Sequence, residues 1–291
     1  MMRKRQGGPG LGTMALIFLC VAAVFAVLWF GFEWIGGLAG QDEPEPELHA
    51  GGGSAEPDGV IAGLAKNRYD LTAFAADGEY LVYHGSPKAS RGIDVSSHQG
   101  QIDWSAVAGD GVEYAMIRVG YRGYTKGDTV LDELFYDNVE GALTNGIQVG
   151  VYFFSQAVTV EEAVEEAELV LRAIEGLEIT YPIIFDWEDI PQEARTDGMD
   201  PVTLTACADA FCGTIAAAGY PAGIYFNQAF GYQEYNLLAL DEYVFWLAQY
   251  DEAPGFYYDF QMWQYTNTGS VSVIEGDVDL NLSFWHPGDP E

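Results

Sequence analysis

From Arg91 onward, short runs of β-branched and aromatic residues alternate with longer, acid-rich stretches of helical character. Such alternation is typical of β/α units, in which a helix follows each strand and covers one face of the sheet. Eight segments have the composition expected of strands: 92–96, 114–121, 150–156, 181–188, 223–227, 244–250, 260–266 and 278–282. Eight such strands predict an α/β fold with a closed barrel, and a chain of 291 residues is long enough to build its core.

Helices are predicted only between the earlier strands, at 132–145, 160–175 and 201–218. The second begins at a capping box formed by Thr159 and Glu162, and the third has Asp200 as its N-cap. After residue 227 the spaces between the strand segments become too short for full helices. We therefore expect the last third of the chain to consist mostly of strand and loop.

The N-terminal segment 13–35 is strongly apolar, and its first twenty residues carry no charge. About 20 such residues suffice to cross the hydrocarbon core of a bilayer. Arg3, Lys4 and Arg5 precede the segment, which predicts that residues 1–12 are cytoplasmic and that the rest of the chain lies outside the cell membrane. Secretion after cleavage of a signal peptide is the alternative, although the apolar stretch of such a peptide is usually about 7–15 residues long.

Three further regions follow the predicted anchor. Residues 41–59 are rich in Glu, Pro and Gly, which predicts a flexible linker. In residues 60–90, two short apolar runs flank Asp77-Gly78, a strong signal for a hairpin, so we expect a hairpin-like appendage to the main domain. Residues 91–288 form the predicted barrel domain.

The charge balance restricts the partners of the chain. There are 44 acidic residues against 12 basic ones, and the formal net charge is −32. Phosphate backbones are bound by excess positive charge, so we predict that nucleic acid is not a partner. The same charge argues against docking on an anionic membrane surface, which leaves the N-terminal helix as the expected contact with the membrane.

The predicted strand 181–188 ends in Asp186-Trp187-Glu188. Side chains alternate along a strand, so the carboxyl groups of Asp186 and Glu188 should point to the same side. The functional groups of a β/α barrel gather where the strands end. Two close carboxyl groups raise the pKa of one of them, and a protonated carboxyl group is the general acid that cleavage of a glycosidic bond requires. A solvated strand end is the structural alternative.

Asp94 and Asp279 lie among apolar neighbours on the first and last predicted strands. Acidic residues are rarely buried without a partner or a function. Closure of the barrel should bring both into one acidic pocket with Asp186 and Glu188, although a turn role for Asp279 and a structural hydrogen bond for Asp94 are alternatives. No Cys/His pair has the spacing of zinc ligands, and we predict neither a metal nor a cofactor.

Aromatic residues also fall near the ends of the predicted strands. Their flat faces pack against the apolar faces of sugar rings, and a carboxylate-lined cleft with aromatic walls suits a carbohydrate. Filling of the barrel interior is the alternative use of such residues. We predict that five aromatic residues and one glutamine bind substrate: Tyr152, Phe154, Tyr225, Trp246, Trp263 and Gln264.

At these positions the chain resembles the glycoside hydrolase family 25 lysozymes, the Chalaropsis-type muramidases. The similarity covers about residues 92–285 and rests on eight motifs in the family's order: GIDVSSHQGQIDW, YAMIRVGYR, DNVEGALTNGIQVGVYFFS, PIIFDWED, GIYFNQ, WLAQY, MWQYT and VDLN. The resemblance implies an irregular, TIM-like (β/α) barrel with eight strands and fewer helices. It also implies hydrolysis of the β-1,4 bond between N-acetylmuramic acid and N-acetylglucosamine in peptidoglycan.

The resemblance further implies roles for individual residues. Glu188 would be the proton donor, Asp186 its partner, and Asp94 and Asp279 would complete the acidic cluster. In a substrate-assisted path Asp186 would orient the N-acetyl group of the sugar, with help from Tyr152; direct attack by water with inversion is the alternative.

Two other functions stay open at this point. A membrane-tethered module could bind peptidoglycan without cutting it, but such a module has no use for two carboxyl groups that repel each other. A chitinase-like glycosidase also carries Asp-x-Glu on a barrel strand, but Asp94 and the VDLN motif favour the muramidase. A tethered muramidase that faces outward would act in remodelling of the cell wall.

Overall fold

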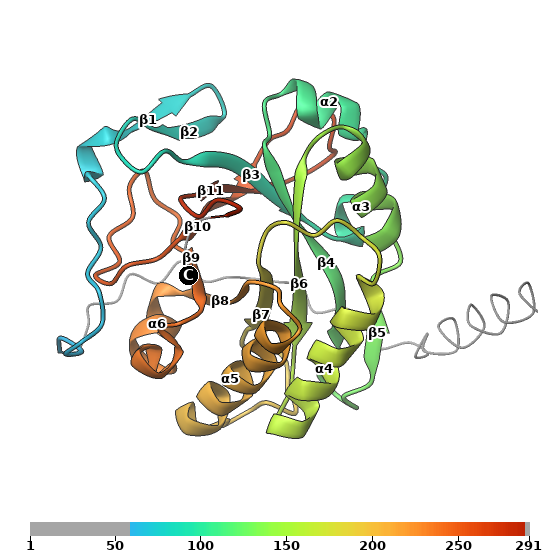
Figure 1. The fold of residues 1–291 in the computed structure, drawn as a ribbon, viewed down its shortest axis with the longest axis vertical. Helices are drawn as coiled ribbons and strands as arrows, with labels where there is room; N and C mark the ends of the chain where they lie inside the picture. The colour runs from blue at the N-terminus through green and yellow to red at the C-terminus, as the bar shows by residue number, and fades with distance from the viewer. Residues whose placement is uncertain (1–58, 289–291) are drawn as a thin grey trace, which may run out of the picture. The chain divides into compact units, whose positions relative to one another are not determined.

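The computed structural model describes residues 59–288, in which eight strands close into a barrel (Figure 1). The strands are β3 (Ser90–Val95), β4 (Tyr114–Arg122), β6 (Gln148–Ser155), β7 (Ile183–Trp187), β8 (Ala222–Asn227), β9 (Val244–Ala248), β10 (Met262–Gly269) and β11 (Val278–Ser283). They follow the order β3-β11-β10-β9-β8-β7-β6-β4, and the pairing of β3 with β4 closes the barrel. All eight predicted barrel strands are confirmed.

The barrel is mixed rather than all-parallel. Neighbouring strands are parallel from β3 through β4, β6, β7, β8 and β9 to β10, whereas β11 is antiparallel to both β10 and β3. The connection between β10 and β11 is too short for the crossover that a parallel pair needs, so the chain reverses direction. A short strand that the sequence did not predict, β5 (Thr129–Leu131), pairs with the end of β4.

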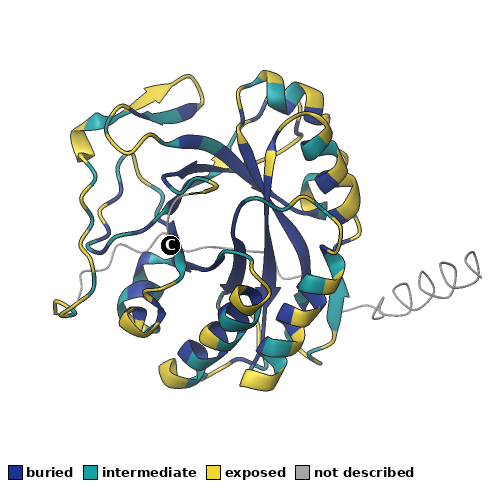
Figure 2. Cartoon of the chain, viewed as in Figure 1, coloured by how far each residue is buried: buried dark blue, intermediate teal, exposed yellow. Residues whose placement is uncertain are grey.

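The three predicted helices are confirmed as α3 (Phe135–Thr144), α4 (Val160–Ala173) and α5 (Pro201–Ala217). Asp200 caps α5 through the backbone N–H groups of Val202 and Thr203. At α4 the Thr159 hydroxyl accepts from Glu162 N, but the Glu162 carboxylate accepts from Val158 N, one residue earlier than a standard capping box. The helices cover the outside of the barrel and expose their outer faces (Figure 2).

Several short helices within residues 59–288 were not predicted. They are η1 (Leu71–Ala73), η2 (Ser97–Gln99), α2 (Trp104–Gly109), α6 (Gln228–Gln233) and η3 (Leu237–Leu240). None exceeds six residues, so none shows enough turns for a hydrophobic period to be visible. The last third is otherwise strand and loop, as expected.

The barrel interior and the space under the helices form two separate cores. Tyr114, Tyr152, Tyr181, Tyr225 and Trp246 belong to the inner core. The rings of Tyr114 and Tyr181 are stacked with centroids 4.4 Å apart. Large side chains thus fill the barrel, and the room for a ligand is left at the ends of the strands.

The segment before the barrel contains the expected hairpin, formed by β1 (Phe74–Asp77) and β2 (Tyr80–Tyr83). Gly78 in its turn has a φ of 65°, a left-handed conformation that glycine adopts without steric cost. The predicted cytoplasmic segment, membrane anchor and nearly all of the linker lie outside the described residues. Within residues 59–288 no helix has both the length and the apolar character needed to cross a membrane.

Candidate active site

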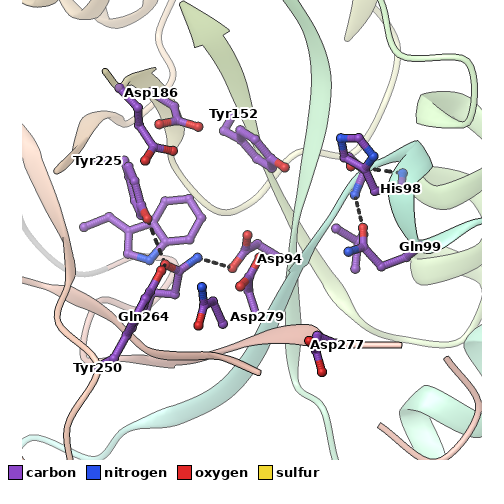
Figure 3. A pocket seen from close by; sticks show the side chains of 15 residues that line it. Asp94, His98, Gln99, Tyr152, Asp186, Tyr225, Tyr250, Gln264, Asp277 and Asp279 are labelled. Carbon is purple, nitrogen blue, oxygen red and sulfur yellow. Dashed lines mark hydrogen bonds between the residues drawn. The ribbon is translucent and has the colours of Figure 1, made fainter. Parts of the chain in front are cut away.

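A cavity of about 300 Å³ opens where the barrel strands end, and all four predicted catalytic carboxyl groups line it. Figure 3 shows Asp94, Asp186 and Asp279 around this cavity. The fifteen lining residues are Asp94, Val95, Ser96, His98, Gln99, Tyr152, Asp186, Glu188, Tyr225, Trp246, Tyr250, Gln264, Asn267, Asp277 and Asp279.

Strand alternation places the acidic side chains in this cavity. On β7, Phe185 and Trp187 point outward into the core under the helices, while Ile184 and Asp186 point inward. Glu188 follows the last residue of the strand and keeps the inward direction. Because β11 runs antiparallel to β3, its beginning lies beside the end of β3, and Asp279 is the register partner of Asp94.

Asp94 is the centre of a buried hydrogen-bond network. Its Oδ2 accepts from Gln264 Nε2 at 3.0 Å and from Asn281 Nδ2 at 2.7 Å. Gln264 Oε1 accepts from the hydroxyl groups of Tyr225 and Tyr250, at 2.8 and 3.0 Å. Asn281 Oδ1 accepts from Trp246 Nε1 at 2.9 Å. The network fixes the side chains that line one wall of the cavity.

The carboxyl groups of Asp94 and Asp279 are hydrogen-bonded to each other. Burial, the charge of Asp94 and this hydrogen bond raise the pKa of Asp279 to about 9. Burial also raises the pKa of Asp94, but the hydrogen bonds from Gln264, Asn281 and Asp279 oppose that rise. Asp279 is therefore protonated at neutral pH, and its O–H group donates a hydrogen bond to the Asp94 carboxylate.

Asp186 and Glu188 form the second carboxyl pair. Burial, followed by the charges of Asp94 and Asp189, raises the pKa of Glu188 to about 8. Burial and the neighbouring Glu188 raise the pKa of Asp186 well above its usual value, which the Arg118 guanidinium partly opposes. Glu188 therefore carries a proton at neutral pH and is available as a general acid.

The two members of this pair differ in exposure. Asp186 is 4 % exposed, and its Oδ1 has no hydrogen-bond partner within residues 59–288. Glu188 is half-buried. A bound ligand can reach the Glu188 carboxyl group, and a ligand N–H or O–H can satisfy Asp186 Oδ1.

Four of the six predicted substrate-binding residues line the cavity: Tyr152, Tyr225, Trp246 and Gln264. The Trp246 ring makes edge-on contacts with the rings of Tyr225 and Tyr152, with centroid distances of 5.0 and 6.1 Å. These aromatic residues belong to the inner core and also form the cavity wall.

Trp263 and Phe154 do not line the cavity, which corrects their expected placement. On β10, Met262 and Gln264 face the barrel interior, so Trp263 faces outward. Its ring contacts Phe74 of the hairpin at a centroid distance of 5.3 Å, and its Nε1 donates to Gln249 O. Phe154 is only 1 % exposed and lies outside the cavity lining.

The structure adds polar residues to the cavity that had no predicted role. Ser96, His98 and Gln99 follow Asp94 in the η2 turn, where Ser96 and Gln99 form a capping box. Asn267 and Asp277 lie on the β10–β11 side. The sequence could have indicated these residues by their position, because they directly follow or flank the strands that carry the predicted catalytic carboxyl groups. Within residues 59–288, no group of three or more His, Cys, Asp or Glu side chains is arranged to hold a metal ion.

Comparison with known proteins gives a consistent family match. The model of the glycosyl hydrolases family 25 matches residues 93–274. The chain is 27 % identical over 192 residues to an autolytic lysozyme of Clostridium acetobutylicum and 28 % identical over 204 residues to lysozyme M1 of Streptomyces globisporus. Each alignment covers 66 % of this chain, and they cover 55 % and 66 % of the relatives. The chain thus spans little more than half the length of the first relative.

Solved structures show the same fold. The modular autolysin LytC from Streptococcus pneumoniae superposes with a TM-score of 0.60 at 24 % identity, over 72 % of this chain and 52 % of that one. A family 25 glycosyl hydrolase from Bacillus anthracis gives a TM-score of 0.57 at 21 % identity, over 72 % of this chain and 96 % of that one. The second match covers nearly the whole of the Bacillus anthracis chain.

Proposed function

The chain belongs to the glycosyl hydrolases family 25, and from that premise we propose that it is a peptidoglycan hydrolase of the lysozyme type. It cleaves the β-1,4 bond between N-acetylmuramic acid and N-acetylglucosamine. The observation that carries this proposal is the joint presence of Asp94, Asp186, Glu188 and Asp279 in one cavity with aromatic walls. Two relatives at 27 % and 28 % identity are lysozymes, and a structure of LytC holds a synthetic peptidoglycan ligand.

In the proposed reaction Glu188 donates its proton to the oxygen of the leaving sugar as the glycosidic bond breaks. The carbonyl oxygen of the substrate's own N-acetyl group attacks the anomeric carbon, and the acetamido N–H donates to Asp186 Oδ1. That donation favours the ionised form of Asp186. Water then attacks the anomeric carbon and gives a proton to the Glu188 carboxylate, which restores the resting state.

The experiment is digestion of purified peptidoglycan by the full-length chain and by Glu188→Gln, with the new reducing ends identified by mass spectrometry. Glu178→Gln is the matched control, because Glu178 is exposed and does not line the cavity. Reducing N-acetylmuramic acid ends that are lost only in Glu188→Gln support the proposal. Reducing N-acetylglucosamine ends show a different bond specificity, and release of chito-oligosaccharides from chitin shows a chitinase-like enzyme. Tight binding without release indicates a peptidoglycan-binding module.

The anomeric configuration of the first product, followed by NMR, tests the route of the reaction. Retention supports participation of the N-acetyl group, because two displacements occur at the anomeric carbon. Inversion supports a single direct attack by water.

We also propose that residues 13–35 anchor the enzyme in the cell membrane, with the N-terminus cytoplasmic and the barrel outside, where it remodels the cell wall. The support is the uncharged stretch after Arg3, Lys4 and Arg5. Membrane fractionation and N-terminal sequencing of the protein from cells test this. A product that begins after residue 35 and accumulates in the medium indicates secretion instead.

A further inference from the structure

We propose that Gln156 is a positioning residue that fixes the backbone of the general acid Glu188, and that Thr196 holds Gln156 in place for this task. The proposal rests on the function proposed above for Glu188. Neither Gln156 nor Thr196 lines the cavity, so both act on the substrate only through Glu188.

Gln156 uses its whole side-chain amide inside the protein. It is 0 % exposed. Its Nε2 donates to Glu188 O at 2.9 Å and to Ser155 O at 3.0 Å. Its Oε1 accepts from Thr196 Oγ1 at 2.8 Å, and Thr196 is itself only 5 % exposed. A buried amide with every polar group satisfied has one preferred orientation.

Glu188 needs such a contact because it lies beyond the last residue of β7 that pairs with β6. The last register pair between β6 and β7 is Ser155 with Trp187, and Glu188 is the next residue. The Glu188 carbonyl is bound instead by the Gln156 side chain, which extends the β6–β7 pairing by one residue. The contact fixes the peptide group of Glu188 and thereby the direction in which its carboxyl group enters the cavity.

The loop that carries Thr196 is also held at the next residue, Arg195. Its backbone N–H donates to Tyr124 O at 2.8 Å, and its guanidinium donates to Glu162 Oε1 at 2.6 Å and to Gln156 O at 3.3 Å. The loop is thus joined to the turn between β4 and β5 and to the first turn of α4. Because both contacts hold the loop, Thr196 gives Gln156 a fixed partner.

Only an amide can make these contacts together. Ionised Glu at position 156 has no donor and places its charge against two carbonyl oxygens, whereas protonated Glu has one donor. Thr196→Val keeps the shape of the side chain and removes the hydroxyl group, so Gln156 Oε1 loses its donor. Thr196→Ser keeps the hydroxyl group and is the conservative rescue.

The test compares kcat, KM and the pH profile of kcat/KM for peptidoglycan hydrolysis by the full-length chain and its variants. We expect Thr196→Val to lower kcat about 10-fold and Gln156→Glu about 100-fold, with KM changed less than about twofold, because a misplaced acid slows the chemical step more than binding. Thr196→Ser should restore kcat to within about threefold. Gln148→Glu, on the exposed first residue of β6, is the matched control and should equal the wild type.

A shift in the alkaline limb of the pH profile is the readout that a merely structural role would not produce. The charges of Asp94 and Asp189 raise the pKa of Glu188, so a displaced Glu188 should titrate at a different pH in Gln156→Glu and Thr196→Val. The proposal would be overturned if both variants had the kcat and the pH profile of the wild type. It would also be overturned if kcat fell only in proportion to the folded fraction, as measured by circular dichroism. Full activity of Glu188→Gln would instead overturn the proposed function.

Discussion

The protonated carboxyl group of Asp279 donates a hydrogen bond to Asp94 across the β3–β11 pair, where the two residues are direct register partners. The antiparallel direction of β11 makes this contact possible, because it brings the first residues of β11 to the open end of the barrel. This pair therefore contains one carboxyl group, that of Asp279, that stays protonated at neutral pH and one, that of Asp94, that accepts hydrogen bonds from Gln264 and Asn281. At neutral pH the cavity therefore carries less negative charge than its number of acidic residues indicates.

The first prediction concerns the pH dependence of stability. The pKa of Asp279 is about 9 in the folded state against 3.8 in the unfolded chain. Its contribution to stability is therefore complete below about pH 4 and is lost as the pH rises through about 9. Asp279→Asn keeps a donor to Asp94 without titrating, so its melting temperature should fall less than that of the wild type between about pH 5 and 9. If the melting temperatures of Asp279→Asn and the wild type change equally with pH, Asp279 does not hold this proton.

The second prediction concerns Glu188, the proposed general acid. The charge of Asp189 helps to raise the pKa of Glu188. Asp189→Asn removes that charge, so the alkaline limb of kcat/KM should move to lower pH, and activity at about pH 8 should fall more than activity at about pH 6. Asp241→Asn is the control, because Asp241 is exposed and outside the cavity. An unchanged limb in Asp189→Asn would contradict the assignment of this limb to Glu188.

The third prediction concerns Asn281, which joins Asp94 to Trp246 and is 0 % exposed. Asn281→Leu leaves the Trp246 Nε1 donor without its partner and removes one donor from Asp94. We expect the free energy of unfolding to fall by about 2–4 kcal/mol, since each unpaired buried group costs about 1–3 kcal/mol. Urea denaturation measures this, with the exposed Asn236→Leu as control. A loss equal to that of the control would mean that the network does not stabilise the fold.

Much of the site could be predicted because a strand has a period of two residues. Asp186 and Glu188 point the same way for that reason, and Asp94 stood out as an acidic residue among apolar neighbours. Trp263 was misplaced because residues 262–265 of β10 are buried on both faces of the strand, so an aromatic residue there can face inward or outward. The polar Gln264 was the better indication of which face points inward.

Other features depend on tertiary contacts that no local pattern contains. Asn281 is bound to Asp94 because β11 and β3 are neighbours in the closed barrel. Gln156 reaches the Glu188 carbonyl for a similar reason, since β6 and β7 are adjacent. The strand β5 has only three residues, and its pairing with β4 decides its conformation. A single sequence gives no direct signal for these contacts.

The fourth prediction concerns a buried ion pair under the helices. Arg122 Nε donates to Glu166 Oε1 at 2.6 Å, and both side chains are buried. Arg122→Ala leaves the Glu166 carboxyl group without its cation, which should cost about 3–5 kcal/mol of unfolding free energy at about pH 8. Burial raises the pKa of Glu166 to about 7, so the loss should be smaller at about pH 5, where Glu166 is protonated. Guanidinium denaturation at both pH values measures the difference, and an equal loss would show that Glu166 is not the group left unpaired.

The last prediction concerns the segment before the barrel, which lies outside the family match at residues 93–274. Tyr69 stacks on Phe284 with centroids 3.9 Å apart, and its hydroxyl group donates to Phe260 O at 2.6 Å. Tyr69→Ala removes both contacts and should lower the free energy of unfolding by about 2–3 kcal/mol, whereas Tyr69→Phe loses only the hydrogen bond, about 1 kcal/mol. Leu71→Ala is the control, because Leu71 is 50 % exposed. If Tyr69→Ala is as stable as this control, the segment before the barrel does not stabilise it. If Tyr69→Ala loses the expected free energy, the barrel of this chain depends for part of its stability on a segment that lies outside the family match.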